Sequence, residues 1–137
     1  MMLRRWVWAT WLLAVGYVVG TAAGFATFHI GVVTMWLTIL LLMPLLFAAL
    51  ALVWLRKLRV PAKRGGREMA GLIAYWVLMS FLLDALTYIF TLPHFMHTVP
   101  NRHFFVDQSP WIWLSYATLC TSGAAAVALH KRSLRPV

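Results

Sequence analysis

The sequence predicts an all-α membrane protein with four transmembrane helices packed as an antiparallel bundle. Of its 137 residues, 63% are hydrophobic and only 11% are charged, whereas a soluble domain averages about 25% charged residues. A domain of this length exposes too much surface to hide so many apolar side chains from water. Four apolar runs, at 6–28, 32–55, 69–92 and 110–129, each reach the about 20 residues that a helix needs to cross the hydrocarbon core. We expect one membrane domain over 1–137.

The positive charges predict how these runs cross the membrane. The net charge is +9, and eleven of the twelve Lys and Arg residues fall on one side of a four-helix arrangement. These eleven are Arg4, Arg5, six cations between residues 56 and 68, Lys131, Arg132 and Arg135. Short basic loops stay in the cytoplasm, so both termini are expected there, in a multi-pass protein of the cell (inner) membrane. Nucleic acid is not expected as a partner, because the cations form no soluble basic face.

The first run, 6–28, carries a repeat of small residues. Gly16, Gly20 and Gly24 recur every four residues and share one stripe of a helix, where another backbone can approach closely. We favour packing inside this chain's own bundle, and the alternative is a homodimer or a partner-subunit interface. Two basic residues before an apolar stretch also resemble a secretory signal peptide. We expect the run to be retained, because a discarded leader would not need this stripe.

The second run, 32–55, follows a very short turn and therefore forms a helical hairpin with the first. Pro44 lies near its middle, where it removes one amide donor and clashes with the carbonyl four residues earlier, so we expect a static kink. The loop 56–68 then holds six cations against one acid. Besides setting the topology, it is expected to contact anionic head groups of the lipid bilayer, at about 1 kcal/mol per basic residue. The alternative is a docking site for a cytosolic partner or for nucleic acid.

The third run, 69–92, contains the one carboxylate inside an apolar segment, Asp84. A charge at the centre of a membrane helix costs on the order of 2.5–3.5 kcal/mol on insertion scales, so Asp84 should face the protein interior and have a partner. Further polar residues at a spacing of three to four form a stripe with it, namely Ser80, Thr87, Tyr88 and Thr91. We interpret Asp84 as a hydrogen-bonded anchor between helices. The alternatives are a proton or cation site in a water-filled cleft, or ligand recognition.

The outer connection, 93–109, is the longest stretch that is not apolar. Arg102 is the one cation on this side and is a candidate partner for Asp84 or Asp107. Two prolines and two adjacent phenylalanines indicate that the connection folds back over the mouth of the bundle. Weak candidates for a metal site are His94, Met96, His97 and His103. Imidazole suits copper and zinc, and thioether suits Cu(I), but the pattern lacks a specific spacing, so no metal or other cofactor is expected.

The fourth run, 110–129, has a clear start signal, with Ser109 as the expected N-cap and Pro110 at the first helical position. A stripe of small residues follows, formed by Thr118, Ser122 and Ala126. Such a face suits close contact with another helix. We expect that contact to be with the glycine stripe of the first run.

The sequence contains few of the patterns on which enzymes depend. It has one cysteine and three acidic residues that lie far apart, and it lacks a phosphate-binding glycine loop and a nucleophile elbow. We therefore expect no catalysis and, first, a structural or interaction role, as an accessory subunit or a self-associating bundle. Its partner would be a second copy or another membrane protein. The alternative is a transport or permeation element that uses Asp84 and the polar stripe, and the third hypothesis is a metal-binding protein that uses the outer histidines.

Overall fold

The computed structural model describes residues 2–134, and its regular elements are helices. Within this range, four helical segments are long and apolar enough to cross a membrane. Three of them are single helices, namely α1 (Met2–Phe28), α2 (Val32–Lys57) and α6 (Trp111–Ser133). The third segment along the chain is an unbroken stretch of α3 (Gly65–Asp84), η1 (Ala85–Thr91) and α4 (Leu92–Phe95). A short helix, α5 (Phe104–Asp107), lies in the connection before α6. The prediction of an all-α chain with four membrane-length helices is confirmed.

The long helices extend past the apolar runs that predict them. The additional turns carry charges, because α1 includes Arg4 and Arg5 and α2 ends with Arg56 and Lys57. The connection between α2 and α3 is therefore 58–64 and not 56–68. Arg and Lys are good helix formers, so a helix continues in water where the hydrophobic signal has already stopped. Arg135, one of the eleven cations counted above, lies outside the described residues.

The start of α6 differs from the prediction. Pro110 occupies the N-cap position, the helix begins at Trp111, and no side chain caps it. Ser109 belongs to the turn that follows α5, where its amide donates to the Val106 carbonyl at 3.1 Å. The Ile112 amide donates to the Gln108 carbonyl, also at 3.1 Å. This backbone bond supplies an acceptor for an amide of the first turn, so the Ser109 hydroxyl is not needed there.

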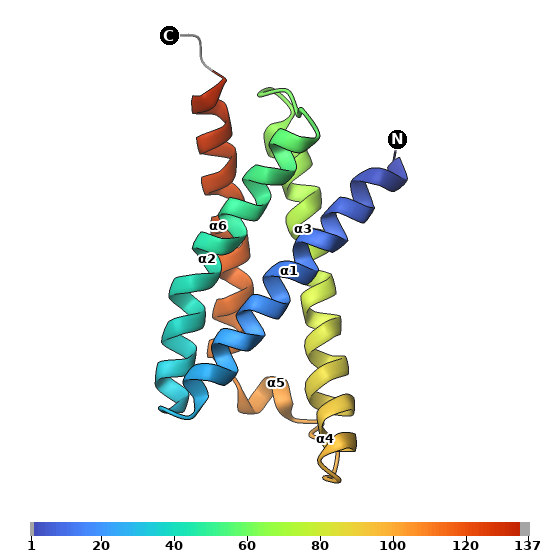
Figure 1. Ribbon diagram of the computed structural model, residues 1–137, viewed down its shortest axis with the longest axis vertical. Helices are drawn as coiled ribbons and strands as arrows, with labels where there is room; N and C mark the ends of the chain where they lie inside the picture. The colour runs from blue at the N-terminus through green and yellow to red at the C-terminus, as the bar shows by residue number, and fades with distance from the viewer. Residues whose placement is uncertain (1, 135–137) are drawn as a thin grey trace.

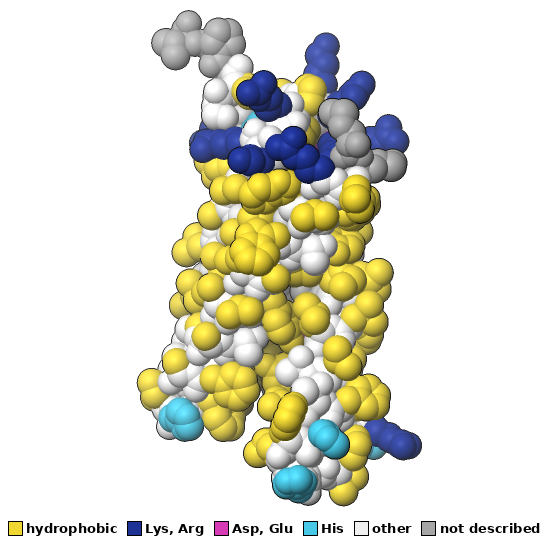
Figure 2. Space-filling model, turned by 45° about the vertical axis from the view of Figure 1, so that its right-hand side comes forward, with side chains coloured by type: hydrophobic (Ala, Val, Ile, Leu, Met, Phe, Trp, Pro, Cys, Tyr) yellow, Lys and Arg dark blue, Asp and Glu magenta, His cyan; other side chains and the backbone are white. Residues whose placement is uncertain are grey.

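The chain reverses direction between successive long helices (Figure 1). The start of α1, the connection 58–64 and the end of α6 lie together at what we call the basic end. The turn 29–31, α4 and α5 lie at the opposite end. Figure 2 shows Lys and Arg side chains gathered at the basic end and histidines at the tips of the opposite end. Neighbouring helices are α1 with α2, α2 with α6, and α6 with α3.

The larger of two buried clusters lies in the half of the molecule near the basic end, and a smaller one around Trp36, Ile112 and Tyr116 lies toward the opposite end. Trp76 of α3 is fully buried, and its indole N–H donates to the Ala9 carbonyl of α1 at 2.9 Å. Its ring packs edge to face on Phe47 of α2, with the ring centroids 5.2 Å apart. The hydroxyls of Thr10 and Tyr75 lie 2.7 Å apart and add a second link between α1 and α3. These contacts hold α1 against α3 in this half of the molecule.

The glycine stripe of α1 packs against α2 and not against α6, so that expectation was wrong. A methyl group on Gly16 would lie 2.6 Å from Cζ of Phe47, and one on Gly20 would lie 2.5 Å from Cε of Met43. Gly24 faces Ile39 in the same way, at 3.3 Å. The turn 29–31 forces α1 and α2 to be neighbours, and large side chains of α2 fill the space that the glycines leave.

The small residues of α6 face α2 and α3. The Ser122 hydroxyl donates to the Pro44 carbonyl of α2 at 3.0 Å and to the Thr118 carbonyl at 2.6 Å. Gly123 lies where a methyl group would be 2.7 Å from Cγ1 of Ile73 in α3. The close approach that small residues permit therefore places α6 between α2 and α3.

Candidate functional site

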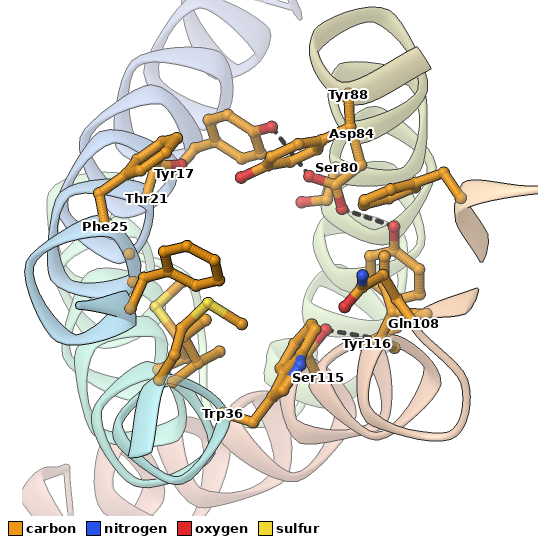
Figure 3. Close-up of a pocket in the computed structure, with 18 of the residues that line it drawn as sticks. Tyr17, Thr21, Phe25, Trp36, Ser80, Asp84, Tyr88, Gln108, Ser115 and Tyr116 are labelled. Carbon is orange, nitrogen blue, oxygen red and sulfur yellow. Dashed lines mark hydrogen bonds between the residues drawn. The ribbon is translucent and has the colours of Figure 1, made fainter. Parts of the chain in front are cut away.

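Asp84, at the end of α3, is hydrogen-bonded to two other helices. Its Oδ1 accepts a hydrogen bond from the Tyr17 hydroxyl of α1 at 2.8 Å, and its Oδ2 accepts one from the Tyr116 hydroxyl of α6 at 2.6 Å (Figure 3). Hydroxyl bonds to a carboxylate are short and strong. The side chain of Asp84 thus connects three helices at the level where α1 and α3 begin to separate.

Arg102 is not the partner of Asp84, contrary to one expectation. Its side chain is exposed in the connection between α4 and α5. Over residues 2–134, the one ion pair joins Arg5 to Glu68 at 3.0 Å, at the basic end. Asp107, the other candidate partner of Arg102, accepts a hydrogen bond from the Asn101 side chain at 3.1 Å. An exposed cation gains little from an ion pair in water, so Arg102 has no strong reason to fold inward.

Neither tyrosine partner was predicted from the sequence. A buried carboxylate needs hydrogen-bond donors, and a neutral phenol supplies one without a second buried charge. The available signal was the position of Tyr17 and Tyr116 well inside their helices, away from the interfacial levels where tyrosine is usually enriched. Such a residue must find a partner for its hydroxyl inside the protein. Which partner it finds depends on helix rotation.

The polar stripe is only partly realised, because the helix changes its winding after Asp84. η1 is a π-helix, in which backbone bonds run from residue i to i+5. The Thr91 hydroxyl donates to the Leu86 carbonyl, five residues earlier, at 2.8 Å. Ser80 lies four residues before Asp84 in α3, and Tyr88 lies four residues after it in the wider winding of η1, and these three side chains line the same cavity. Thr87 and Thr91 do not line it, and Thr91 is exposed.

The cavity beside Asp84 has a volume of about 350 Å³ and is formed by α1, α2, α3, η1 and α6. Its polar lining is concentrated around the carboxylate and includes Tyr17, Thr21, Ser80, Tyr88 and Tyr116. The remaining lining is mostly apolar, with the largest share from α2. Figure 3 shows aromatic rings of Tyr17, Phe25, Trp36, Tyr88 and Tyr116 around the open space. The cavity is therefore mainly apolar, and Asp84 is the one acidic residue that lines it.

The cavity is closed toward the basic end and covered at the opposite end. Phe47 and Leu119 form its floor, and both also belong to the core. At the other end Phe104 of α5 stacks on Tyr88 with ring centroids 4.8 Å apart, and Phe105 stacks on Phe81 at 4.5 Å. The connection 93–109 thus folds back over the helices, as its composition predicts.

The side of the cavity between α1 and α3 is more open. The two helices are in contact near the basic end and diverge toward the opposite end (Figure 1). A furrow in the molecular surface separates the α1–α2 tip from the α3–α4 tip (Figure 2). Phe25 and Phe28 of α1 line the cavity and are exposed. A hydrophobic molecule dissolved in the bilayer would reach the cavity by this route.

The indole N–H of Trp36 is buried and has no acceptor within residues 2–134. The Trp36 ring lines the cavity across from Asp84 (Figure 3). A buried donor without an acceptor costs about 1–3 kcal/mol. This unpaired donor is buried within the packed side chains beside the cavity.

The outer histidines are not gathered into one cluster in the described part of the chain. His94, His97 and His103 are exposed, as is Met96. Across the described part of the chain, no three His, Cys, Asp or Glu side chains lie close enough together to hold a metal ion. The residues fall on both sides of an extended connection, so closeness in sequence does not bring their ring nitrogens together. The hypothesis of a metal-binding outer loop is not supported by this arrangement.

Comparison of the chain with models of protein families, with curated proteins and with solved structures finds no significant match. The cavity combines a carboxylate and several tyrosine hydroxyls with a mainly apolar surface. Such a site can bind and orient a molecule that is largely hydrophobic.

Proposed function

We propose that this chain is an integral membrane protein that binds one small lipophilic molecule in the cavity beside Asp84, with no catalytic step of its own. The observation that carries the proposal is an apolar cavity of about 350 Å³ with one hydrogen-bonded carboxylate in its wall. Ligand sites in proteins are typically concave, mostly apolar, about 300–1,000 Å³ in volume, and furnished with a few polar groups that fix orientation. The cavity has each of these properties.

The shape of the cavity favours binding over permeation by this chain alone. A transport pathway needs polar access from both sides of the membrane. Here the polar wall around Asp84 is separated from the basic end by the core that contains Phe47, Trp76 and Leu55. The site is therefore a pocket reached from one half of the membrane. Transport would require the core to open, which is costly for closely packed side chains.

We propose further that the four helices form an antiparallel bundle in the cell membrane with both termini in the cytoplasm. The gathering of Lys and Arg at the basic end supports this orientation, because cytoplasmic loops carry an excess of these residues. The cations of 58–64 would then meet anionic head groups of the inner leaflet. The cavity would open in the outer half of the bilayer.

Cysteine labelling of intact cells tests this orientation. In a Cys120→Ala background, a membrane-impermeant maleimide should label Thr98→Cys, in the exposed connection after α4, before permeabilisation. Lys63→Cys, in the connection between α2 and α3, should react only afterwards. Labelling of Lys63→Cys before permeabilisation and of Thr98→Cys only afterwards would show the opposite orientation in the membrane.

Native mass spectrometry of protein extracted gently from its own membrane tests ligand binding. We expect the wild-type protein to retain a small molecule at a ratio of one per chain. Thr21→Phe should abolish this additional mass, because Thr21 lines the cavity and a phenyl ring would fill it. Ala22→Phe is the matched control, since Ala22 is the next residue of α1 and is exposed. Identical spectra for wild type and Thr21→Phe would contradict the proposal.

An interaction role is the second candidate, and the outward face of α6 favours it. Small residues are exposed along this face at helical spacing, namely Ala117, Thr121, Ala124 and Ala128. Small residues are enriched where membrane helices associate, and the glycine stripe of α1 is already occupied by α2. Native mass spectrometry of the extracted protein also tests the interaction role. A dimer or a second protein in the complex would support an interaction role, and a bare monomer would count against it.

A further inference from the structure

We infer that the ligand of this cavity is a lipophilic organic cation, with Asp84 as its counter-ion and the surrounding aromatic rings as its cage. The inference rests on the proposed function above and specifies the chemical class of the ligand. Its three supports are the charge balance around Asp84, the arrangement of the aromatic rings, and the apolar character of the remaining walls.

The charge that Asp84 carries when it is ionised is not balanced by a cationic side chain within residues 2–134. Both of its hydrogen-bond partners, Tyr17 and Tyr116, are neutral donors. No cation pairs with it anywhere in residues 2–134, where the one ion pair is between Arg5 and Glu68. A carboxylate offers about four lone-pair sites, and two hydroxyls occupy only part of that capacity. Acidic side chains inside membrane segments are rare and mark ion or substrate sites, so the missing partner is sought in the ligand.

The rings around the cavity suit a positive charge. Tyr17, Tyr88 and Tyr116 lie beside the carboxylate, with Phe25 and Trp36 across the open space (Figure 3). The face of an aromatic ring attracts a cation within about 6 Å of its centroid, most strongly where water is excluded. Aromatic cages of this kind recognise quaternary ammonium groups. A carboxylate and a cage in one cavity favour a diffuse organic cation.

The other walls exclude a simple hydrated ion. Apart from Asp84, no charged side chain lines the cavity within the described chain. A hard metal cation such as Ca²⁺ requires about six to eight oxygen ligands, and one carboxylate with scattered hydroxyls does not supply them. An organic cation needs few ligands and gains from contact with Met43, Ile39 and Ile112 on the apolar walls. Its apolar part would enter along the furrow between α1 and α3.

Binding of two probes of equal shape and opposite charge tests the inference. The full-length protein in lipid nanodiscs is equilibrated with tetraphenylphosphonium or with tetraphenylborate, and bound probe is counted by equilibrium dialysis. Cavity binding is the difference between the amount of probe bound by the wild-type protein and the amount bound by Thr21→Phe. We expect saturable cavity binding of about one tetraphenylphosphonium per chain and at least about tenfold weaker binding of tetraphenylborate, equivalent to about 1.4 kcal/mol.

Two substitutions assign the effect to the residues named above. Asp84→Asn keeps the size and the acceptor oxygen of the side chain but removes the charge, and it should weaken tetraphenylphosphonium binding at least about tenfold, about 1.4 kcal/mol. Asp107→Asn, on the exposed connection, should leave binding unchanged. Phe25→Leu removes one ring of the cage without touching the carboxylate and should weaken binding about three- to tenfold. Phe90→Leu is its control on the lipid face of η1, where Phe90 is exposed.

The outcomes separate the inference from the proposed function. Equal cavity binding of the two probes, or wild-type affinity in both Asp84→Asn and Phe25→Leu, would overturn the cation inference and leave a neutral ligand site. The same conclusion follows if neither probe binds while the native mass is still lost in Thr21→Phe. Absence of both probe binding and a native mass would overturn the site itself. If Asp84→Asn fails to fold, as a thermal melt would show, Phe25→Leu decides.

Discussion

A loss of roughly 3–5 kcal/mol in the free energy of unfolding is expected for Trp76→Ala, the largest effect of any single substitution that we predict. Trp76 has 0% of its surface exposed, so its removal leaves a cavity that the packed core cannot fill. Its indole N–H also donates to the Ala9 carbonyl at 2.9 Å, and its ring packs on Phe47. The substitution therefore weakens the attachment of α1 to α3 in the half of the molecule where these helices meet.

The free energy of unfolding is measured by adding SDS to the protein in mixed micelles, with the loss of helix monitored by circular dichroism. Trp11→Ala is the matched control, because Trp11 lies on α1 with 62% of its surface exposed. It should change stability by less than about 0.5 kcal/mol. Trp76→Phe keeps most of the buried area and loses the hydrogen bond, so it should fall between the two. Equal stability of Trp76→Ala and Trp11→Ala would show that this core is not what holds the helices together.

Gly16→Ala is expected to destabilise the protein by about 1–3 kcal/mol, although alanine is the better helix former. The new methyl group would lie 2.6 Å from Cζ of Phe47 and 2.9 Å from its Cε1. Phe47 cannot move aside, because only 2% of its surface is exposed and its ring packs on Trp76. The clash must therefore separate α1 from α2.

Two other glycines provide a graded comparison in the same unfolding assay. At Gly24 the methyl group would meet Cδ1 of Ile39 at 3.3 Å, a contact that a small shift relieves. At Gly71, on α3, it would meet nothing within 4 Å. Stability should therefore fall most in Gly16→Ala and little in Gly24→Ala, and it should stay level or rise in Gly71→Ala. Equal effects at the three positions would refute the packing of the stripe against α2.

The sequence predicts the four long helices well because hydrophobic length is a property of each segment by itself. It predicts the ends of those helices less well, since Arg4 and Lys57 continue a helix without contributing to the apolar run. It also predicts that Asp84 needs a partner. The identity of that partner depends on how α1 and α6 are rotated, which no periodicity in α3 reveals.

The winding of η1 illustrates a second limit. A π-helix is defined by which carbonyl each amide reaches, and residues 85–91 carry no residue type that specifies this choice. The predicted polar stripe assumes ordinary helical spacing beyond Asp84, and the prediction fails at Thr87 and Thr91, which do not line the cavity. A cleft at Asp84 was expected only as an alternative, because the cavity results from the divergence of α1 from α3 and not from any motif.

Because of that divergence, α1 and α3 are joined near the basic end and lie apart toward the opposite end. α1 and α3 are fastened by Trp76 and Tyr75 near the basic end and by the Tyr17–Asp84 bond at the head of the furrow. Beyond this point the two helices can change their spacing without disturbing the core. Under the proposed function, a bulkier ligand would displace the part of α1 beyond Tyr17, with the largest displacement at the turn 29–31. A site of this kind would tolerate variation in ligand size better than a change in ligand charge.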